Sequence, residues 1–181
     1  MGRAKALLEG VGQTFLERAV GTLRAGGCED VVVVFNDEED ELLAPAAQAG
    51  GRLARGAGVV SQQIDSLRSG VRALPPGAEA AVILPVDHPL VQPSTVALLV
   101  GAFRSSGAPI VRVVHSGRHG HPVLLSAALF DELLSSPLEE GARSLIRAHI
   151  GEVAEVEVDD PGVLIDVDTP EEYERYKGVL E

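Results

Sequence analysis

Val82-Ile-Leu-Pro-Val-Asp-His-Pro-Leu-Val-Gln-Pro93 is the stretch on which the interpretation of this 181-residue chain depends. Residues 80–86 form an apolar run that is too short for a helix and is followed by a lone carboxylate, Asp87. Two prolines come next, before a helical pattern begins at Ser94. This order predicts a buried strand that delivers one acid to a loop. Because ligands in open α/β sheets bind beyond the carboxyl ends of strands, Asp87 either handles a metal or substrate group or simply closes the turn.

The rest of the chain alternates between apolar runs and helical patterns. Further strands are expected over residues 31–35, 109–114, 122–125, 153–158 and 163–167, with a short one within 50–58. Helices are expected after Thr14, over 61–74, 94–104, 127–134 and 141–149, and from Thr169, and a separate short helix is expected to end at about residue 49. Such alternation predicts a mostly parallel sheet with helices on both faces. We therefore expect one three-layer, doubly wound α/β domain over residues 1–181, with an antiparallel excursion around 109–126.

The composition limits the kinds of partner. The chain has 15 Lys and Arg against 27 Asp and Glu, a formal net charge of -12, and 45% hydrophobic residues. Nucleic-acid and anionic-membrane surfaces are not expected, because both require clustered positive charge. A mononucleotide remains possible, since Mg2+ and one or two cationic side chains neutralise its phosphates. Cys28 is the only cysteine, and the sequence shows neither an apolar run of membrane-spanning length nor a secretory signal, so the cytoplasm is the expected compartment.

Carboxylates follow two of the expected strands. Asp87 follows residues 80–86, and Asp166 and Asp168 lie at the end of residues 163–167. If both strands end at the same edge of the sheet, two or three carboxylates converge there, and such a set of hard oxygen ligands suits Mg2+. The alternative for Asp168 is a helix-capping role, because Asp-Thr-Pro-Glu is also a good helix start.

Two further groups of residues have both a functional and a structural interpretation. His119-Gly-His-Pro122 lacks the additional Cys or His ligands that a zinc site needs, so His121 either shapes a substrate pocket or fixes its own turn. Arg3 and Lys5, in a glycine-containing opening, either contact phosphates or are simply solvated. Phosphate-loop, dinucleotide-binding and nucleophile-elbow motifs are absent from the sequence. The residues alone therefore predict an α/β domain with a Mg2+-assisted site and do not identify a substrate.

Several blocks follow one another along the chain: Met1-Gly-Arg-Ala-Lys5, Thr14-Phe-Leu-Glu-Arg18, Pro85-Val-Asp-His-Pro-Leu-Val91, Gly120-His-Pro-Val123, Gly141-Ala-Arg-Ser-Leu145 and Asp166-Val-Asp-Thr-Pro-Glu-Glu-Tyr173. In this order they resemble the MobA-like NTP transferase family, and most closely its molybdenum cofactor cytidylyltransferases. The guanylyl-transferring relatives usually carry an Asp before the signature Lys, where this chain has Ala4. The resemblance implies a nucleotide-diphospho-sugar transferase-like, Rossmann-like fold and transfer of CMP from CTP to molybdopterin-bound molybdenum, with release of pyrophosphate.

The resemblance also implies roles for individual residues. Lys5 and Asp87 would be catalytic, and Gly2, Arg3, Lys5 and Ser66 would bind the nucleotide. Mg2+ would be held by Asp87 with Asp168 or Asp166, while His121 and Pro122 would lie on the pterin side. No protein nucleophile is needed, because nucleotidyl transfer depends mainly on positioning and charge neutralisation. A molybdenum hydroxylase is a further expected partner.

The sequence departs from the family at its beginning. The family opens with a buried strand and a loop of the type Leu-Ala-Ala-Gly-x-Ser-x-Arg, and this sequence starts at the Met that follows that Arg. Loss of that strand would leave unpaired backbone along two neighbouring strands, and the 181-residue chain is expected to bind CTP poorly. Two alternatives remain open: a non-catalytic molybdenum-cofactor chaperone that hands the cofactor to a hydroxylase, and a relative that uses another small phosphorylated acceptor.

Overall fold

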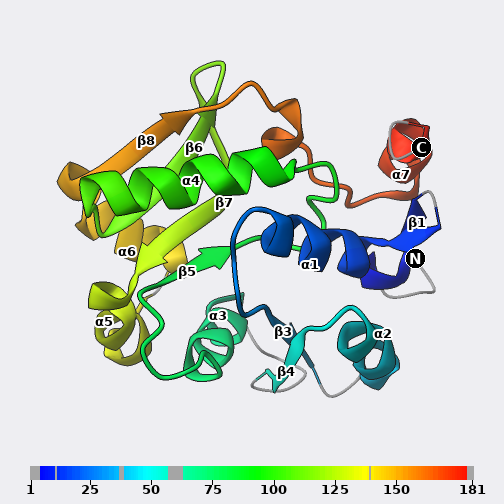
Figure 1. Ribbon diagram of the computed structural model, residues 1–181, viewed down its shortest axis with the longest axis horizontal. Coiled ribbons are helices and arrows are strands. Elements are labelled where there is room, and N and C mark those ends of the chain that lie inside the picture. Colours follow the sequence, from blue (N-terminus) through cyan, green and yellow to red (C-terminus); the bar gives the residue numbers. More distant parts are fainter. Residues whose placement is uncertain (1–4, 11, 37–38, 57–62, 139, 179–181) are drawn as a thin grey trace.

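The framework of the protein is a set of three sheets, seen in a computed structural model that describes residues 5–10, 12–36, 39–56, 63–138 and 140–178 (Figure 1). The largest sheet has the order β5-β7-β6-β8, formed by Ala80–Ile83, Arg118–Ser126, Ile110–His115 and Val153–Glu157. β7 runs antiparallel to both β5 and β6, and β8 runs parallel to β6. This arrangement confirms the antiparallel excursion expected around residues 109–126.

Two smaller sheets accompany the large one. β3 (Val32–Phe35) and β4 (Arg52–Arg55) pair in parallel, with Val32 opposite Arg52. β1 (Glu9–Gly10) and β2 (Gln13–Thr14) form a short antiparallel pair near the amino end.

Helices connect these strands. The α-helices are α1 (Phe15–Ala25), α2 (Leu43–Gln48), α3 (Gln63–Arg72), α4 (Pro93–Ser106), α5 (Phe130–Ser135), α6 (Ala142–Ala148) and α7 (Pro170–Lys177); the short 3-10 turns are η1 (Lys5–Leu7), η2 (Asp40–Leu42), η3 (Ala127–Leu129), η4 (Ile150–Glu152) and η5 (Pro161–Leu164). None of the helices in the described ranges is long and apolar enough to cross a membrane.

Local sequence signals explain where α1 begins and ends. The Thr14 hydroxyl accepts a hydrogen bond from the Glu17 backbone N–H at 3.2 Å, and the Glu17 carboxylate accepts one from the Thr14 N–H at 2.7 Å. This reciprocal capping box satisfies two backbone donors that a helix start otherwise leaves without partners. Gly26 forms the carboxyl-terminal cap, as the Gly-Gly pair after residue 25 predicts.

Both faces of the large sheet are covered. On one face Leu99 of α4 packs with Val111, Val113 and Leu124, and all four side chains are buried. On the other face α3, α5 and α6 contribute Ile64, Leu133 and Leu145, which pack with Ile110 and Leu125. Neighbouring strand residues such as Ile110 and Val111 thus point into separate cores, as expected for a sheet with helices on both sides. The predicted three-layer α/β architecture is confirmed.

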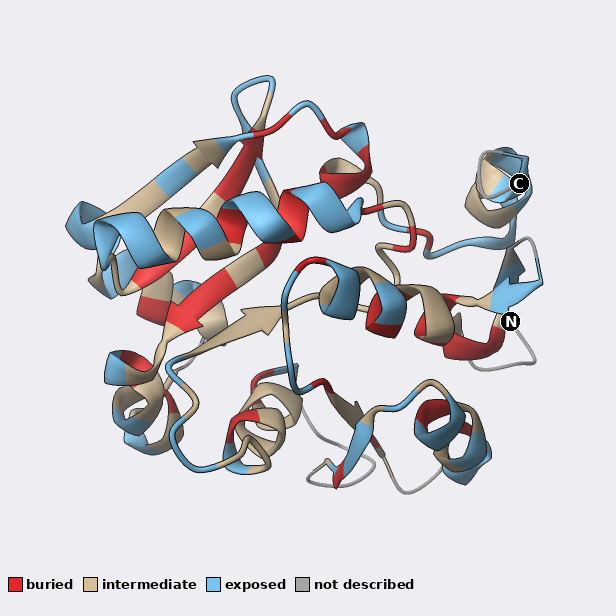
Figure 2. Ribbon diagram, viewed as in Figure 1, coloured by how far each residue is buried: buried red, intermediate tan, exposed pale blue. Residues whose placement is uncertain are grey.

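β3 and β5 differ from the other central strands because each has one edge without a strand partner in the described part of the chain. β3 pairs only with β4, and β5 pairs only with β7. Their side chains are apolar, yet Val32, Val33 and Val34 and all four residues of β5 are only partly buried, as the tan colour of β5 in Figure 2 shows.

The expected strand over residues 163–167 is wrong. Pro161 to Leu164 form η5, and residues 165–169 belong to no helix or strand. The apolar pattern was misleading because Asp160 turns the chain: its carboxylate accepts a hydrogen bond from the Gly162 N–H at 3.0 Å. Gly162 also approaches the Leu90 carbonyl so closely that a Cβ atom would collide with it.

Two boundaries also need correction. The strand expected over residues 122–125 begins earlier, at Arg118, because the turn before it is limited to Ser116 and Gly117, with φ angles of 50° and 73°. His119 and His121 therefore belong to β7. Side-by-side positive φ values are typical of tight hairpins, which explains why the strand resumes so soon. β5 ends at Ile83 instead of residue 86, so Asp87 lies in the loop after the strand and not at the end of the strand itself.

Candidate functional site

The loop after β5 is tied to the carboxyl-terminal segment of the chain. The Val167 N–H donates a hydrogen bond to the Asp87 carbonyl oxygen at 2.8 Å, which places Asp168 next to the Asp87 loop. This backbone contact joins the segment of Asp166 and Asp168 to the Asp87 loop, although the strand expected over residues 163–167 is not found among the described residues. The convergence of the three carboxylates stays a prediction.

Asp87 has a side-chain oxygen without a protein partner. Its Oδ1 atom is buried and accepts no hydrogen bond from the described residues. The Nε2 atom of His88 lies 4.0 Å from Asp87 Oδ1, a separation beyond hydrogen-bonding range. A buried carboxylate oxygen without a donor is costly, so this atom is suited to a cation or a ligand donor.

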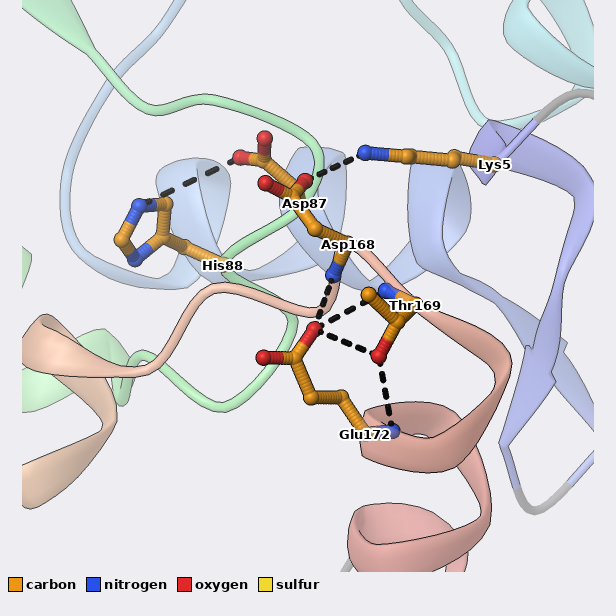
Figure 3. A network of polar contacts seen from close by, with 6 residues as sticks. All are labelled: Lys5, Asp87, His88, Asp168, Thr169 and Glu172. Carbon is orange, nitrogen blue, oxygen red and sulfur yellow. Dashed lines mark hydrogen bonds and ion pairs between the residues drawn. The ribbon is translucent and has the colours of Figure 1, made fainter.

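Asp168 forms an ion pair with Lys5 (Figure 3). The Asp168 N–H donates a hydrogen bond to the Glu172 carboxylate at 2.9 Å, and the Thr169 hydroxyl accepts one from the Glu172 N–H at 3.2 Å. The cap of α7 is therefore Thr169, and the Asp168 carboxylate remains free of the capping role that was its alternative interpretation. The backbone hydrogen bonds from Asp168 and Thr169 hold the pKa of Glu172 below its usual value.

Two histidines lie beside the acidic loop. The rings of His88 and His121 are 4.9 Å apart between centroids, and the Nδ1 atom of each is buried without a hydrogen-bond partner in the described part of the chain. Burial lowers the pKa of His121 to about 4, with smaller contributions from the positive charges of His88 and Arg143 against the opposing charge of Asp166. His121 is therefore a neutral imidazole near pH 7. The peptide bond from His121 to Pro122 is cis, and Pro122 is buried.

The other predicted site residues have different outcomes. Ser66 lies on α3 and lines a large groove between β3 and β5, which His121 also lines. Gly2 and Arg3 lie outside the described residues. His88 and Arg143 were not predicted as site residues. Both lie inside sequence blocks that pointed to the family, and this was the available signal for them.

The described residues contain no group of three or more His, Cys, Asp or Glu side chains arranged to hold a metal ion. The side chains of Lys5 and Asp168 are 37% and 50% exposed, so their ion pair can open at little cost. A Mg2+ site commonly uses only one or two protein carboxylates, with substrate phosphates and water as its other ligands. The orphan oxygen of Asp87 and the carboxylate of Asp168 fit that donor set.

The groove between β3 and β5 has a volume of about 1620 Å3. Val31 to Val34 form one wall, Ala80 to Val86 form the other, and side chains of α1 and α3 also line it. A separate cavity of about 250 Å3 is lined by Lys5 together with Val33, Val34, Glu39 and Val86. Lys5 therefore lies where the carboxyl ends of β3 and β5 come together.

Comparison with known proteins gives a family match. The family model of the MobA-like NTP transferase domain matches residues 1–153. The chain is 28% identical over 163 residues to a 3-deoxy-manno-octulosonate cytidylyltransferase from Anaeromyxobacter sp. (strain Fw109-5), which covers 81% of this chain and 64% of that relative. It is 34% identical over 119 residues to the purine catabolism protein PucB from Bacillus subtilis (strain 168), which covers 64% of this chain and 56% of PucB. The chain thus spans less than two thirds of the length of either relative.

A solved structure agrees with the fold. The manganese complex of Rv0371c from Mycobacterium tuberculosis has a TM-score of 0.82 and 25% sequence identity, with coverage of 98% of this chain and 93% of that one. Asp168 lies outside the residues that the family model matches, whereas Lys5 and Asp87 lie inside them.

Proposed function

Because this chain belongs to the MobA-like NTP transferase family, we propose that it is a Mg2+-dependent nucleotidyltransferase that moves CMP from CTP to molybdopterin-bound molybdenum cofactor. The observation that carries the proposal is the ion pair of Lys5 with Asp168, on a segment that the Val167 N–H bonds to the Asp87 loop (Figure 3). Lys5 also lines the small cavity next to β3 and the segment after β5. This place in an α/β sheet is where nucleotides bind. The cytidylyltransferase among the relatives supports CTP as the donor.

In the proposed reaction, a phosphate oxygen of the acceptor attacks the α-phosphorus of CTP. The bond from that phosphorus to the oxygen bridging to the β-phosphate breaks, and pyrophosphate leaves with the bonding electrons. Such a transfer needs positioning and neutralisation of charge, and no covalent step on the protein. Lys5 would leave Asp168 and contact triphosphate oxygens, and an exposed pair can rearrange in this way at a cost below about 1 kcal/mol.

Asp87 and Asp168, with Asp166 nearby in sequence, would hold Mg2+ in this proposal. When bound, the ion would neutralise phosphate charge and orient the triphosphate. The manganese complex of Rv0371c supports a divalent metal in this fold. On the protein side, Asp87 supplies a buried oxygen with no competing donor, so it can face a cation without first breaking a hydrogen bond.

His121 and Pro122 are proposed to face the acceptor. As a neutral imidazole, His121 can accept or donate a hydrogen bond but does not add positive charge. Arg143, whose charge acts on His121, is the candidate to balance an anionic acceptor on that side. The acceptor end would thus combine the cation of Arg143 with the neutral imidazole of His121.

The first test measures thermal unfolding with CTP, GTP, ATP and UTP, each with and without Mg2+. Weak CTP binding remains a prediction, so each nucleotide is titrated into the millimolar range. CTP with Mg2+ should raise the melting temperature most, because a ligand that binds only the folded state stabilises it by mass action. Asp87→Asn should abolish the Mg2+-dependent part of the shift. The control Asp131→Asn, at an exposed position on α5, should retain it.

The second test separates an enzyme from a cofactor chaperone. Pyrophosphate release is measured with CTP, Mg2+ and molybdenum cofactor, alongside binding of the cofactor itself. The proposal requires pyrophosphate release that depends on both CTP and the acceptor. Cofactor binding with no release by any nucleotide would refute the transferase and favour the chaperone, and release with a different phosphorylated acceptor would refute the molybdenum cofactor assignment.

A further inference from the structure

The ion pair between Lys5 and Asp168 joins two groups that the proposed function gives to different ligands. Lys5 would serve the triphosphate and Asp168 the divalent metal, yet in the structure they bind each other, as Figure 3 shows. The ammonium of Lys5 contacts Asp168 Oδ1. A metal ion on the same carboxylate would lie beside this ammonium and be repelled by it, because like charges repel strongly at contact distance. Lys5 and a metal ion are therefore competitors for Asp168.

The backbone is held in place on both sides of this ion pair. Lys5 begins η1, in which the next two residues are buried. The Asp168 N–H donates a hydrogen bond to the Glu172 carboxylate at 2.9 Å. The preceding N–H, that of Val167, donates to the Asp87 carbonyl oxygen at 2.8 Å. A lysine ammonium on its flexible stem turns easily, so Lys5 can change partners by rotation of its side chain without a change of fold.

Asp168 has a second carboxylate close by. Backbone hydrogen bonds from Asp168 and Thr169 lower the pKa of Glu172, and the negative charge of Asp168 opposes this effect. The two carboxylates therefore repel each other, within a chain whose formal net charge is -12. A carboxylate in such surroundings favours a cation as its partner. Lys5 supplies that cation in the structure, and a metal ion can take its place when Lys5 turns to another anion.

The cavity of about 250 Å3 that Lys5 lines lies beside β3 and the segment after β5. Ligands of open α/β sheets bind beyond the carboxyl ends of strands, so a triphosphate in this region would be within the range of a rotating Lys5 side chain. We propose that Lys5 and a divalent metal compete for Asp168, and that Lys5 contacts the triphosphate only after it gives Asp168 up. This inference rests on the proposed function and adds a coupling between its two ligands. Because such coupling is reciprocal, each ligand strengthens the binding of the other by the same factor.

The first test measures binding of Mn2+ alone, from the loss of the electron paramagnetic resonance signal of the free ion. Lys5→Met should bind Mn2+ about two- to fivefold more tightly than the unchanged chain, because removal of an exposed ion pair changes an equilibrium constant by up to about fivefold. The matched control is Lys177→Met, which removes the only other lysine of the sequence, paired with Glu174 at 3.8 Å on α7. It should bind Mn2+ as the unchanged chain does. Unchanged or weaker binding by Lys5→Met, or an equal gain in both variants, would overturn the inference.

The second test measures binding of CTP in the presence of EDTA by calorimetry, with CTP titrated into the millimolar range. Asp168→Asn should bind metal-free CTP about two- to fivefold more tightly, because Lys5 is released from its ion pair. The gain should disappear when Lys5→Met is added to this variant. A gain of equal size in the double variant would come from the loss of negative charge alone and would overturn the inference, as would the absence of any gain.

The competition and the proposed function can fail separately. The Mn2+ measurement involves neither nucleotide nor activity, so tighter Mn2+ binding by Lys5→Met together with no pyrophosphate release from any nucleotide would refute the transferase and leave the competition standing. Intact transfer of CMP by the unchanged chain, without a gain in Mn2+ affinity for Lys5→Met, would refute the competition alone. Absence of Mn2+ binding in all variants would overturn both the competition and the proposed metal site.

Discussion

Asp160 joins the carboxyl-terminal segment to the start of α4, and its removal is expected to destabilise the protein strongly. The side chain is 3% exposed. Its carboxylate accepts hydrogen bonds from the Thr95 hydroxyl at 2.6 Å, the Gln92 N–H at 2.9 Å and the Gly162 N–H at 3.0 Å. The Gln92 side chain makes no capping bond, and Asp160 instead holds the start of α4 through the Gln92 N–H and the Thr95 hydroxyl.

The expected magnitude follows from these three bonds. A hydrogen bond to a charged group contributes about 1.5–3 kcal/mol, but bonds to one carboxylate are not additive. Asp160→Ala leaves buried donors without an acceptor, and we expect a loss of about 3–5 kcal/mol, the range seen when one partner of a buried charged contact is removed. For a chain of this size that loss lowers the melting temperature by about 6–20 °C. Asp160→Asn, which keeps one acceptor oxygen, should give an intermediate loss.

Urea denaturation monitored by circular dichroism measures these free energies. The matched control is Asp159→Ala, which removes the same side chain from the neighbouring, exposed position and should change stability by less than about 0.5 kcal/mol. The reasoning is refuted if Asp160→Ala costs no more than the Asp159 control, because the three hydrogen bonds would then contribute nothing net.

Three further predictions concern single contacts. Lys5→Met should lower the free energy of unfolding, measured in urea, by less than about 1 kcal/mol, because the ion pair of Lys5 is exposed. The same substitution should remove most of the nucleotide-induced rise in melting temperature. A large loss of stability would instead make Lys5 a structural residue. Hydrogen bonds to Glu152 and Glu132 raise the pKa of His149, so protonated His149 adds to the free energy of unfolding. This contribution is full below about pH 6.5 and is lost as the pH rises through the folded-state pKa. Denaturation at several pH values should show the decline in the free energy of unfolding, and His149→Gln should flatten it. Gly120→Ala should lower the free energy of unfolding by about 1–3 kcal/mol, because the added Cβ would meet the Val163 backbone. Gly101 is exposed in α4 with open space around it, so Gly101→Ala should raise the free energy of unfolding by about 0.5–1 kcal/mol. Equal melting temperatures for the two variants would contradict the packing argument.

Local signals in the sequence were sufficient to predict much of the fold. The capping boxes at Thr14 and Thr169 located the starts of α1 and α7, and the run ending at Phe35 located β3. These features depend on neighbouring residues, so they are visible without tertiary structure. The prediction of a strand over residues 163–167 was wrong because this apolar segment belongs to a turn. The geometry of that turn depends on Asp160 and on the close approach of Leu90.

The candidate site was predictable as a set of residue types but not as an arrangement. The sequence predicted that Asp87 and Asp168 converge, and the structure shows a backbone bond from Val167 to Asp87 that joins their two segments. The tilted contact between the rings of His88 and His121 could not be predicted, because it joins a loop to a strand from a distant part of the chain. The ion pair of Lys5 was equally hidden, since an isolated cation in sequence gives no indication of its partner.

The contact between Lys5 and Asp168 has a consequence for biosynthesis. The ribosome synthesises Lys5 long before Asp168, so their ion pair can form only late in synthesis. The hydrogen bond from Val167 to Asp87 also requires that late segment. The core between α4 and the large sheet contains Val158 and Val163, so this core is complete only a few residues before Asp168 is added. A chain that ends before residue 165 would still contain both valines and would lack the acidic centre, so the core and the site depend on different parts of the last segment.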